Sequence, residues 1–326
     1  AEIKEDLCAG QLTEWLGTPH FFGEIDGKFV SVMGLYVTAD SHDIGVVEGV
    51  ATIELQRRKG IASALLRCLI REFRNNGGKA LYIRAPDNPI AGHLYEKHGF
   101  CYKIGDGLRY LVPGHEDFET AYFANSGLAR IREASWADVL RLVVLYNTDQ
   151  PRWLVKEYLT HCFNDMSFEK HGVLLFKDIE DKRGAMIVLE NPLNQLVGVA
   201  TFVRFDTYYE QKNAILSFRV APTYMEQAVD LLEAAAYRAT DLSIDTLQIY
   251  IADCDRDQKE LVKSAGYFEE ARLRDWLRDG DESIDMLLYT RVLPGTSSPL
   301  YGKHDYRGGR QLWQSERIAK KANGSA

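Results

Sequence analysis

The amino-acid sequence predicts an α/β (α+β) chain of two consecutive domains, and three observations support this prediction. The chain has 326 residues, enough for about two domains at roughly 150 residues each. Its first third alternates short apolar runs typical of strands with segments whose apolar residues recur at helical spacing. The same order of segments recurs between residues 129 and 267, which indicates an internal repeat.

Composition and charge exclude several classes of protein. Apolar residues make up 46% of the chain and charged residues 26%, which is typical of a globular protein. A net charge of −8 argues against a nucleic-acid partner, so any basic site must be local. No run approaches the roughly 18 apolar residues that a membrane span needs, so no membrane partner is expected. Five separated cysteines without metal-type spacing favour a reducing compartment, and we expect a cytoplasmic protein without a bound metal.

The first third contains strand and helix signals in a clear order. Residues 20–38 alternate apolar and polar side chains around Asp26-Gly27, which predicts a hairpin. Residues 46–53 and 80–85 predict two further strands, with a short helix over 90–98 after the second. Between these strands an amphipathic helix begins at Gly60 and ends at a run of asparagine and glycine; its apolar stripe is formed by Ile61, Leu65, Leu66, Leu69, Ile70 and Phe73.

The beginning of this helix breaks a local rule. Arg57, Arg58 and Lys59 come directly before Gly60, although a helix N-terminus already carries partial positive charge and disfavours cations. Free backbone N–H groups beside a glycine form an anion site. Three extra cations fit an anion of several charges, such as a pyrophosphate. Taken alone, the pattern also fits a solvated basic turn.

A second motif resolves this ambiguity. Residues 57–62 fit the pattern Arg/Gln-x-x-Gly-x-Gly/Ala, and the segment NPIAGHLYEKHGF follows at 88–100. Together the motifs resemble the GNAT superfamily of acyl-CoA N-acyltransferases, over residues 21–112. The resemblance implies a mixed, mostly antiparallel sheet flanked by helices in each domain. It also implies acetyl-CoA, or another acyl-CoA, as co-substrate.

The resemblance implies a set of cofactor contacts as well. The strand before the loop would flank the pantetheine arm and thioester with Val50, Ala51 and Thr52. The loop would hold the diphosphate with Arg57, Arg58, Lys59, Gly60, Ile61, Ala62 and Ser63. Asn88 would lie near the cofactor arm, and Tyr95 would lie beside the cofactor sulfur.

Acylation of an amine requires a base, a group that stabilises the oxyanion and a proton donor for the thiolate. An alkylamine, with a pKa near ~10, must lose a proton before it attacks a thioester. Glu48 is the first candidate base; Glu54 and a buried water are alternatives, and His93 and His98 are interpreted as structural. A backbone N–H of the 50–52 strand would stabilise the oxyanion, and the Tyr95 hydroxyl would protonate the thiolate. The competing interpretations are a core aromatic for Tyr95 and a surface carboxylate for Glu48.

The second half repeats the order of elements but not the chemistry. Strands are predicted at 173–176, 186–190, 197–205, 214–221 and 247–252, with a helix over 225–240. The loop before that helix is four residues shorter and reads Thr-Tyr-Met-Glu-Gln at 223–227, without the basic residues or the glycine. Val262 stands where Tyr95 stands in the first copy. We predict a degenerate GNAT domain that binds no CoA; the alternative is an unrelated α/β domain.

These observations divide the chain into a GNAT domain over 1–125, a degenerate domain over 126–293 and an extended polar tail over 294–326. The first strand and helix of the family are mostly missing from the first domain. Either they lie upstream of the given sequence, or the second domain or the tail supplies the missing wall of the acceptor site. A homodimer contact through the second domain or the tail is a further expectation.

The predicted function is transfer of an acyl group, expected to be acetyl, from acyl-CoA to a primary amine of a small molecule. The amine would attack directly in a ternary complex. Two alternatives remain from the sequence. One is a GNAT-fold enzyme with other chemistry on an acyl-CoA, such as decarboxylation, because fold does not fix function. The other is a non-catalytic CoA-binding or scaffold protein.

Overall fold

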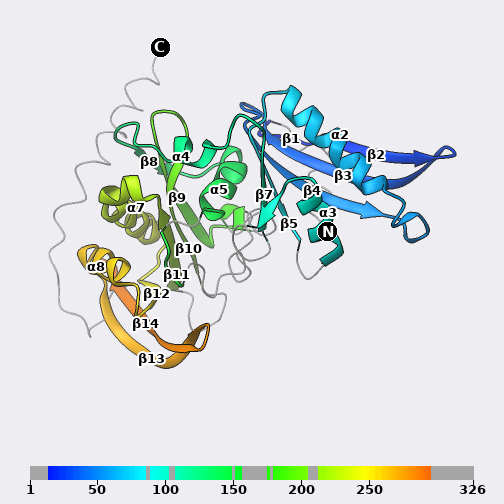
Figure 1. The fold of residues 1–326 in the computed structure, drawn as a ribbon. Helices are drawn as coiled ribbons and strands as arrows, with labels where there is room; N and C mark the ends of the chain where they lie inside the picture. Colours follow the sequence, from blue (N-terminus) through cyan, green and yellow to red (C-terminus); the bar gives the residue numbers. More distant parts are fainter. Residues whose placement is uncertain are drawn as a thin grey trace, which may run out of the picture.

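The structure is a computed structural model, and it describes residues 14–85, 89–102, 107–148, 151–155, 175–176, 179–204 and 212–294. The predictions for Asn88 and for nearly all of the 294–326 tail lie outside the described residues. Two sheets of seven strands each form the framework (Figure 1). Each is mixed and mostly antiparallel and carries helices, so the predicted fold class is confirmed.

The first sheet has the strand order β1-β3-β4-β5-β7-β6, and β2 also pairs with β3. Its strands are β1 (Leu16–Gly17), β2 (His20–Ile25), β3 (Lys28–Thr38), β4 (Ile44–Thr52), β5 (Ala80–Arg84), β6 (Cys101–Tyr102) and β7 (Gly107–Leu111). Only β4 and β5 run parallel. The predicted hairpin turn is present, since Asp26 and Gly27 both have positive φ, at 51° and 73°.

The helical segments around this sheet are η1 (Glu54–Gln56), α2 (Ile61–Asn75), α3 (Pro89–Lys97) and α4 (Phe118–Tyr122). Helix α2 packs its predicted apolar stripe on one face of the first sheet. Leu66 and Leu69 are fully buried there, against Met33 and Leu35 of β3. The period-3.6 pattern of the sequence therefore corresponds to an amphipathic helix with one buried face.

The second sheet has the order β13-β14-β12-β11-β10-β9-β8, with β11 and β12 parallel. Its strands are β8 (Arg130–Glu133), β9 (Gly184–Glu190), β10 (Leu196–Arg204), β11 (Asn213–Val220), β12 (Thr246–Ala252), β13 (Phe268–Asp279) and β14 (Glu282–Val292). The helical segments are η2 (Trp136–Asp138), α5 (Val139–Tyr146), η3 (Pro222–Gln227), α7 (Ala228–Asp241) and α8 (Arg256–Ser264). The strand predicted at 173–176 is wrong where it can be checked, because Leu175 and Phe176 are helical.

The order of elements repeats between the two sheets. The series β3-β4-α2-β5-α3-β6-β7 corresponds to β10-β11-α7-β12-α8-β13-β14, with the parallel pair in the same place. Helices α7 and α8 cover one face of the second sheet, as α2 and α3 cover one face of the first. A repeat read from the sequence thus corresponds to a repeat of architecture.

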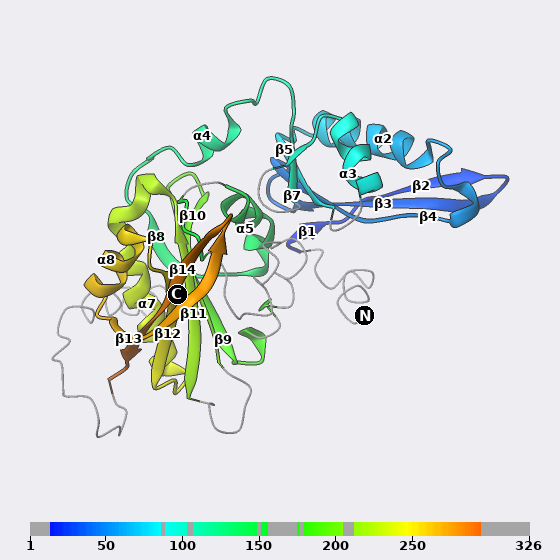
Figure 2. The same ribbon diagram turned by 60° about the horizontal axis from the view of Figure 1, so that its bottom comes forward.

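Helix α5 lies between the two sheets and packs on both. Its side chains Leu142, Val143 and Val144 are fully buried. One shared core joins them to Ile44, Val46 and Tyr82 of the first sheet and to Met186, Val188 and Val199 of the second. Figure 2 shows α2 and α3 on one side of the first sheet and α5 on the other. A helix from the second half of the chain therefore covers one face of the first sheet.

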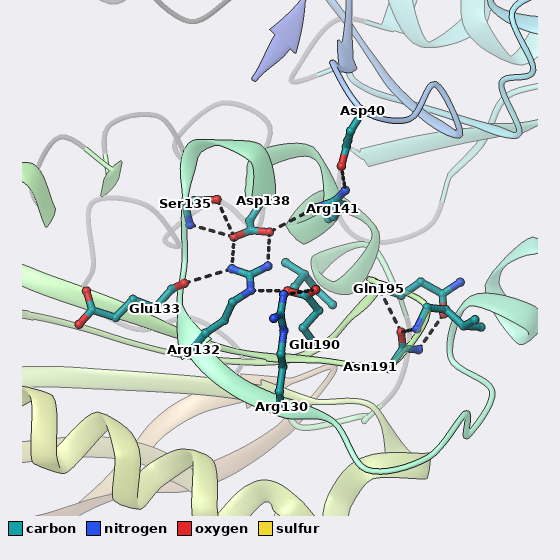
Figure 3. Close-up of polar contacts among 12 residues, drawn as sticks. Asp40, Arg130, Arg132, Glu133, Ser135, Asp138, Arg141, Glu190, Asn191 and Gln195 are labelled. Carbon is teal, nitrogen blue, oxygen red and sulfur yellow. Dashed lines mark hydrogen bonds and ion pairs between the residues drawn. The ribbon is translucent and has the colours of Figure 1, made fainter. Parts of the chain in front are cut away.

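A buried polar cluster fixes the beginning of α5 (Figure 3). Arg132 donates two hydrogen bonds to Asp138, of 2.6 and 2.8 Å, and a further one to Glu190. Asp138 has no exposed surface and also completes a capping box with Ser135. Arg141 of α5 makes an ion pair with Asp40, in the connection between β3 and β4. The cluster is therefore continuous from the second sheet to the first domain.

Candidate functional site

The parallel strands β4 and β5 separate towards their C-terminal ends. Their ladder joins Ile44 to Ala80, Gly45 to Leu81 and Val46 to Tyr82. Strand β4 continues to Thr52, beyond the last rung of the ladder. Within the described residues, the second half of β4 thus has no ladder partner on the β5 side. A gap of this kind between strands presents unpaired backbone groups that can hydrogen-bond an extended ligand.

A β-bulge lies at the point where the two strands separate. On its other side β4 pairs with β3, and the register shifts between the pairs Gly34–Glu48 and Val32–Ala51. Gly49 and Val50 therefore oppose the single residue Met33. Gly49 has a φ of 63°. Such a bulge bends the strand and turns its backbone away from the regular ladder. The bulged part of β4 therefore borders the gap.

The far end of β4 is held in place by a buried serine. The Ser31 hydroxyl, in a side chain that is 6% exposed, donates a 2.9 Å hydrogen bond to the Ala51 carbonyl. It also forms a 2.8 Å hydrogen bond with the Thr52 hydroxyl. Val50, Ala51 and Thr52 thus form an anchored strand end beside the gap, as the predicted pantetheine contacts require.

The basic loop follows directly and ends at the N-terminus of α2. Arg58 and Gly60 both adopt left-handed backbone conformations, with φ of 63° and 80°. The first intrahelical hydrogen bond runs from the Ala64 N–H to the Gly60 carbonyl, at 3.0 Å. The N–H groups from Gly60 to Ser63 are therefore outside the helical ladder. No acidic residue occupies the first turn, so this helix N-terminus presents its free N–H groups without a neighbouring negative charge of its own first turn.

The basic side chains of the loop are exposed and anchored at two points. The Arg57 Nε donates a 3.1 Å hydrogen bond to the Thr52 carbonyl, which ties the loop to the end of β4. The Lys59 Nζ donates a 2.8 Å hydrogen bond to the Gln56 side chain. These contacts hold the loop while its cations remain accessible to an anion in solution.

Ser63 and His98 connect α2 to the end of α3. The Ser63 hydroxyl lies 2.6 Å from the His98 Nε2 and accepts a 3.3 Å hydrogen bond from Arg67. Burial, followed by the charges of Arg67 and Lys97, lowers the pKa of His98. The imidazole is therefore neutral near pH 7 and joins two helices, which supports the structural interpretation of His98.

Tyr95 is buried beside the gap. Its side chain is 3% exposed, and its ring lies 5.8 Å from that of Phe100 between centroids. Burial and then the negative charge of Glu48 raise the pKa of Tyr95 to about 12. The hydroxyl thus keeps its proton throughout the neutral range. Glu48 lies on β4 beside the bulge, and its carboxylate accepts a 3.3 Å hydrogen bond from the Gly49 N–H.

Glu54, the alternative side-chain base named from the sequence, begins the exposed segment η1. His93, interpreted from the sequence as structural, is exposed on α3. The residue that sequence reasoning missed is His20, at the beginning of β2. It pairs with Gly34, and Gly34 pairs with Glu48, so the three residues form one row across the sheet. Only the register across three strands reveals this row, because His20 and Glu48 are far apart in the chain.

In the second domain, the loop before α7 makes contacts with other parts of the same chain. The loop before α7 is a 3-10 turn, η3, whose Thr223 hydroxyl donates a 2.6 Å hydrogen bond to the Phe123 carbonyl. The Gln227 side chain bonds both the N–H and the carbonyl of Ala129, at 3.0 and 2.9 Å. Val262, in the position of Tyr95, is completely buried. No basic anion loop exists among these described residues.

The gap between β11 and β12 is occupied in the same way. Trp153 packs on Phe218 of β11, with 5.0 Å between ring centroids. The neighbouring Leu154 N–H donates a 2.8 Å hydrogen bond to Asp255, just beyond the end of β12. The segment 151–155 thus bridges the two diverging strands. Its Trp153 belongs to the core under α7 and α8 and is 7% exposed.

Comparison with known proteins assigns the first domain to a class. A family model described as the Acetyltransferase (GNAT) family matches residues 2–100, so this part of the chain is similar to that family. No curated protein matches the chain. Among solved structures, an acetyltransferase of the GNAT family from Streptococcus pneumoniae is similar at 17% identity and a TM-score of 0.42. That match covers 51% of this chain and 99% of the other.

Two further solved structures resemble the chain to the same degree. One is a GNAT superfamily phosphinothricin acetyltransferase from Sinorhizobium meliloti in complex with acetyl-CoA. It has 16% identity, a TM-score of 0.45 and coverage of 56% of this chain and 97% of that chain. The other is a spermidine N-acetyltransferase from Vibrio cholerae in complex with CoA and spermine, with 19% identity, a TM-score of 0.41 and coverage of 52% and 96%. Within the described residues, none of the helices combines the length and apolarity of a membrane span.

Proposed function

We propose that the protein is an N-acetyltransferase that moves the acetyl group of acetyl-CoA to a primary amine of a small molecule. The observation that carries this proposal is the continuous path formed by three features. They are the gap after Val46, the bulge at Gly49 and the basic loop that ends at Gly60. An extended thioester with a diphosphate at one end matches the order of these features and their charge pattern. We propose 1–125 as the domain that carries the site and 126–293 as its non-binding companion.

The loop would hold the diphosphate of the cofactor. The unpaired N–H groups at the beginning of α2 carry partial positive charge, and Arg57, Arg58 and Lys59 add full charges beside them. Gly60 supplies the left-handed backbone and has no side chain between the ligand and the amides. Ile61, Ala62 and Ser63 complete the first turn, and Asn88 is assigned to the cofactor arm by the resemblance alone.

The anchored end of β4 would hold the pantetheine and the thioester. Backbone groups of Val50, Ala51 and Thr52 can extend the strand pairing to the amides of the pantetheine. As the amine attacks, negative charge grows on the thioester oxygen, and a fixed N–H from this strand stabilises it. Because Ser31 already holds the strand end, little rearrangement accompanies the reaction.

Tyr95 would assist the departure of the thiolate. A phenol whose pKa is about 12 is a weaker acid than a thiol with a pKa of ~8.5, so complete proton transfer to the sulfur is uphill. The hydroxyl therefore acts chiefly by donating a hydrogen bond to the sulfur as its charge develops. Glu48 reinforces this role, since its charge keeps the phenol protonated, and its carboxylate is proposed to help remove the amine's proton.

The test is a thiol-release assay with acetyl-CoA and a panel of primary amines, followed by mass analysis of the products. We expect one free thiol per acetylated amine and none without an amine. Loss of carbon dioxide from a carboxylated acyl-CoA, with the thioester intact, would replace the proposal with decarboxylation. CoA binding without turnover on any amine or acyl-CoA would indicate a scaffold.

A cytoplasmic location and a homodimer contact stay predictions. The thiols of Cys68, Cys101 and Cys254 are free, which agrees with a reducing compartment. Chromatography with light scattering measures the oligomeric state directly.

A further inference from the structure

His20 lies in register with the proposed catalytic centre although it is far from it in the chain. The row His20–Gly34–Glu48 crosses β2, β3 and β4, and the bulge begins at the next residue, Gly49. Neighbouring strands lie about 4.8 Å apart, so a side chain on β2 must reach across β3 to approach β4. The size of the residue at position 34, between them on β3, decides whether the His20 side chain can approach β4.

Gly34 makes this approach possible. A Cβ at position 34 would lie 3.3 Å from the His20 Nε2 and 3.1 Å from the Glu48 carbonyl oxygen. The imidazole therefore lies over the glycine, and its Nε2 borders the same small space as the Glu48 backbone. Any larger residue would push the ring away from β4.

The hydrogen bond of the other ring nitrogen defines the tautomer. The His20 Nδ1 lies 2.8 Å from the Thr18 carbonyl oxygen. A carbonyl only accepts, so Nδ1 carries the hydrogen and donates it. In the neutral ring the Nε2 then holds the lone pair, and it is this nitrogen that faces β4.

The row also lies on the face of the sheet opposite to Tyr95. Alternation along β4 places Glu48 on the same face as Ile44 and Val46, which contact α5. Tyr95 packs in the core on the opposite face, under α2. A nucleophile that approaches beside His20 and a thiolate that departs towards Tyr95 would therefore use opposite sides of the gap.

Exposed aromatic rings continue this surface from His20 outwards. His20 stacks on Phe22 at 6.3 Å between centroids, and Phe22 contacts Phe29 at 5.1 Å. Phe22 and Phe29 are 54% and 68% exposed. An acceptor with an apolar or aromatic body can cover these rings while its amine lies beside the imidazole.

We propose that His20 is the general base of the acetyl transfer, and that the acceptor is an amine with an apolar or aromatic body. This inference rests on the proposed function. The His20 Nε2 takes a proton from the attacking nitrogen, directly or through one water. The new C–N bond forms as the C–S bond breaks, and the sulfur leaves with its electron pair, hydrogen-bonded to Tyr95. His20 then returns its proton to solvent and the thiolate gains one, giving the acetylated amine and free CoA thiol.

The test compares His20→Asn with wild type on two amines, 2-phenylethylamine and aniline. Asparagine keeps a side-chain N–H for the Thr18 carbonyl but has no base at the Nε2 position. General-base catalysis is worth about 10²–10⁴-fold, so kcat with the alkylamine should fall by at least ~100-fold. Aniline is already neutral at pH 7, so its rate should fall far less. His93→Asn, an exposed histidine on α3, is the matched control and should leave both rates unchanged.

Chemical rescue separates a base from a positioning role. Imidazole added to His20→Ala should restore part of the alkylamine rate, and acetyl-CoA affinity should equal that of wild type throughout. An active wild type with an unchanged His20→Asn, or an equal loss on both amines without rescue, would overturn the role of His20 and leave the proposed function standing. A wild type that acetylates neither these nor any other primary amine would overturn both.

Discussion

The first and second domains have the same order of strands and helices around a parallel pair that separates at one end, yet the segments beside that end differ. In the first domain, β4 has a bulge at Gly49 and leads to a left-handed basic loop. In the second, β11 pairs regularly with β10 from Val220 to Ala214, and the gap contains Trp153. On our proposal the shared framework alone does not make a site, and the bulge and the basic loop are what the second domain lacks.

The largest expected effect comes from emptying the filled gap. Trp153→Ala removes a buried ring and should lower the free energy of unfolding by about 3–5 kcal/mol, measured by urea denaturation. Calorimetry on the folded variant should still give one CoA per chain, because η3 offers no anion loop. Two CoA molecules per chain, in wild type or variant, would show that the gap and not the loop decides binding.

The loop is tested next by Gly60→Val. Valine at a φ of 80° is strained by about 1–3 kcal/mol and adds bulk beside the proposed diphosphate. The dissociation constant of CoA, from calorimetry, should rise by about 100-fold, since each 1.4 kcal/mol is tenfold. Glu226→Ala, an exposed change in η3 of the second domain, is the control and should bind CoA normally. Normal binding by Gly60→Val would refute the loop assignment.

Tyr95→Phe removes a hydroxyl and keeps the ring that packs on Phe100. Loss of a general acid costs about 10²–10⁴-fold, and the weak acidity of this phenol points to the lower end. We expect kcat to fall by about 100-fold while CoA affinity stays the same, which is the pattern of a lost transition-state interaction. Wild-type kcat in the variant would return Tyr95 to a packing role.

The smallest effect is expected for Glu48→Gln. If the carboxylate helps to remove the amine's proton, turnover should fall by roughly tenfold near pH 7, where an alkylamine is mostly charged. The loss should shrink at high pH, where more of the amine is already neutral. Rate–pH profiles of both proteins measure this. An equal loss at every pH would mean that Glu48 has a structural role. No loss would mean that His20 or a water removes the amine's proton.

Sequence patterns predicted the local features of the candidate site but not the features that depend on the register between strands. The basic residues before Gly60 and the stripe of α2 are short-range signals, and both were predicted. The row from His20 to Glu48 depends on two strand pairings and a bulge, which no periodicity encodes. The 139–146 segment is apolar at every position except Arg141, a pattern that predicts burial on all sides, but the pattern does not say that the first sheet is one of its neighbours.

Helix α5 limits how recombination can separate the two domains. Because α5 comes from the second half and covers Ile44, Val46 and Tyr82 of the first, a gene fragment that encoded the first domain alone would lack the helix that packs on these residues. The second domain thus remains indispensable even though its own gap is closed. Recombination can transfer both domains together. A break between the two sheets would separate the first domain from α5, which forms part of its core.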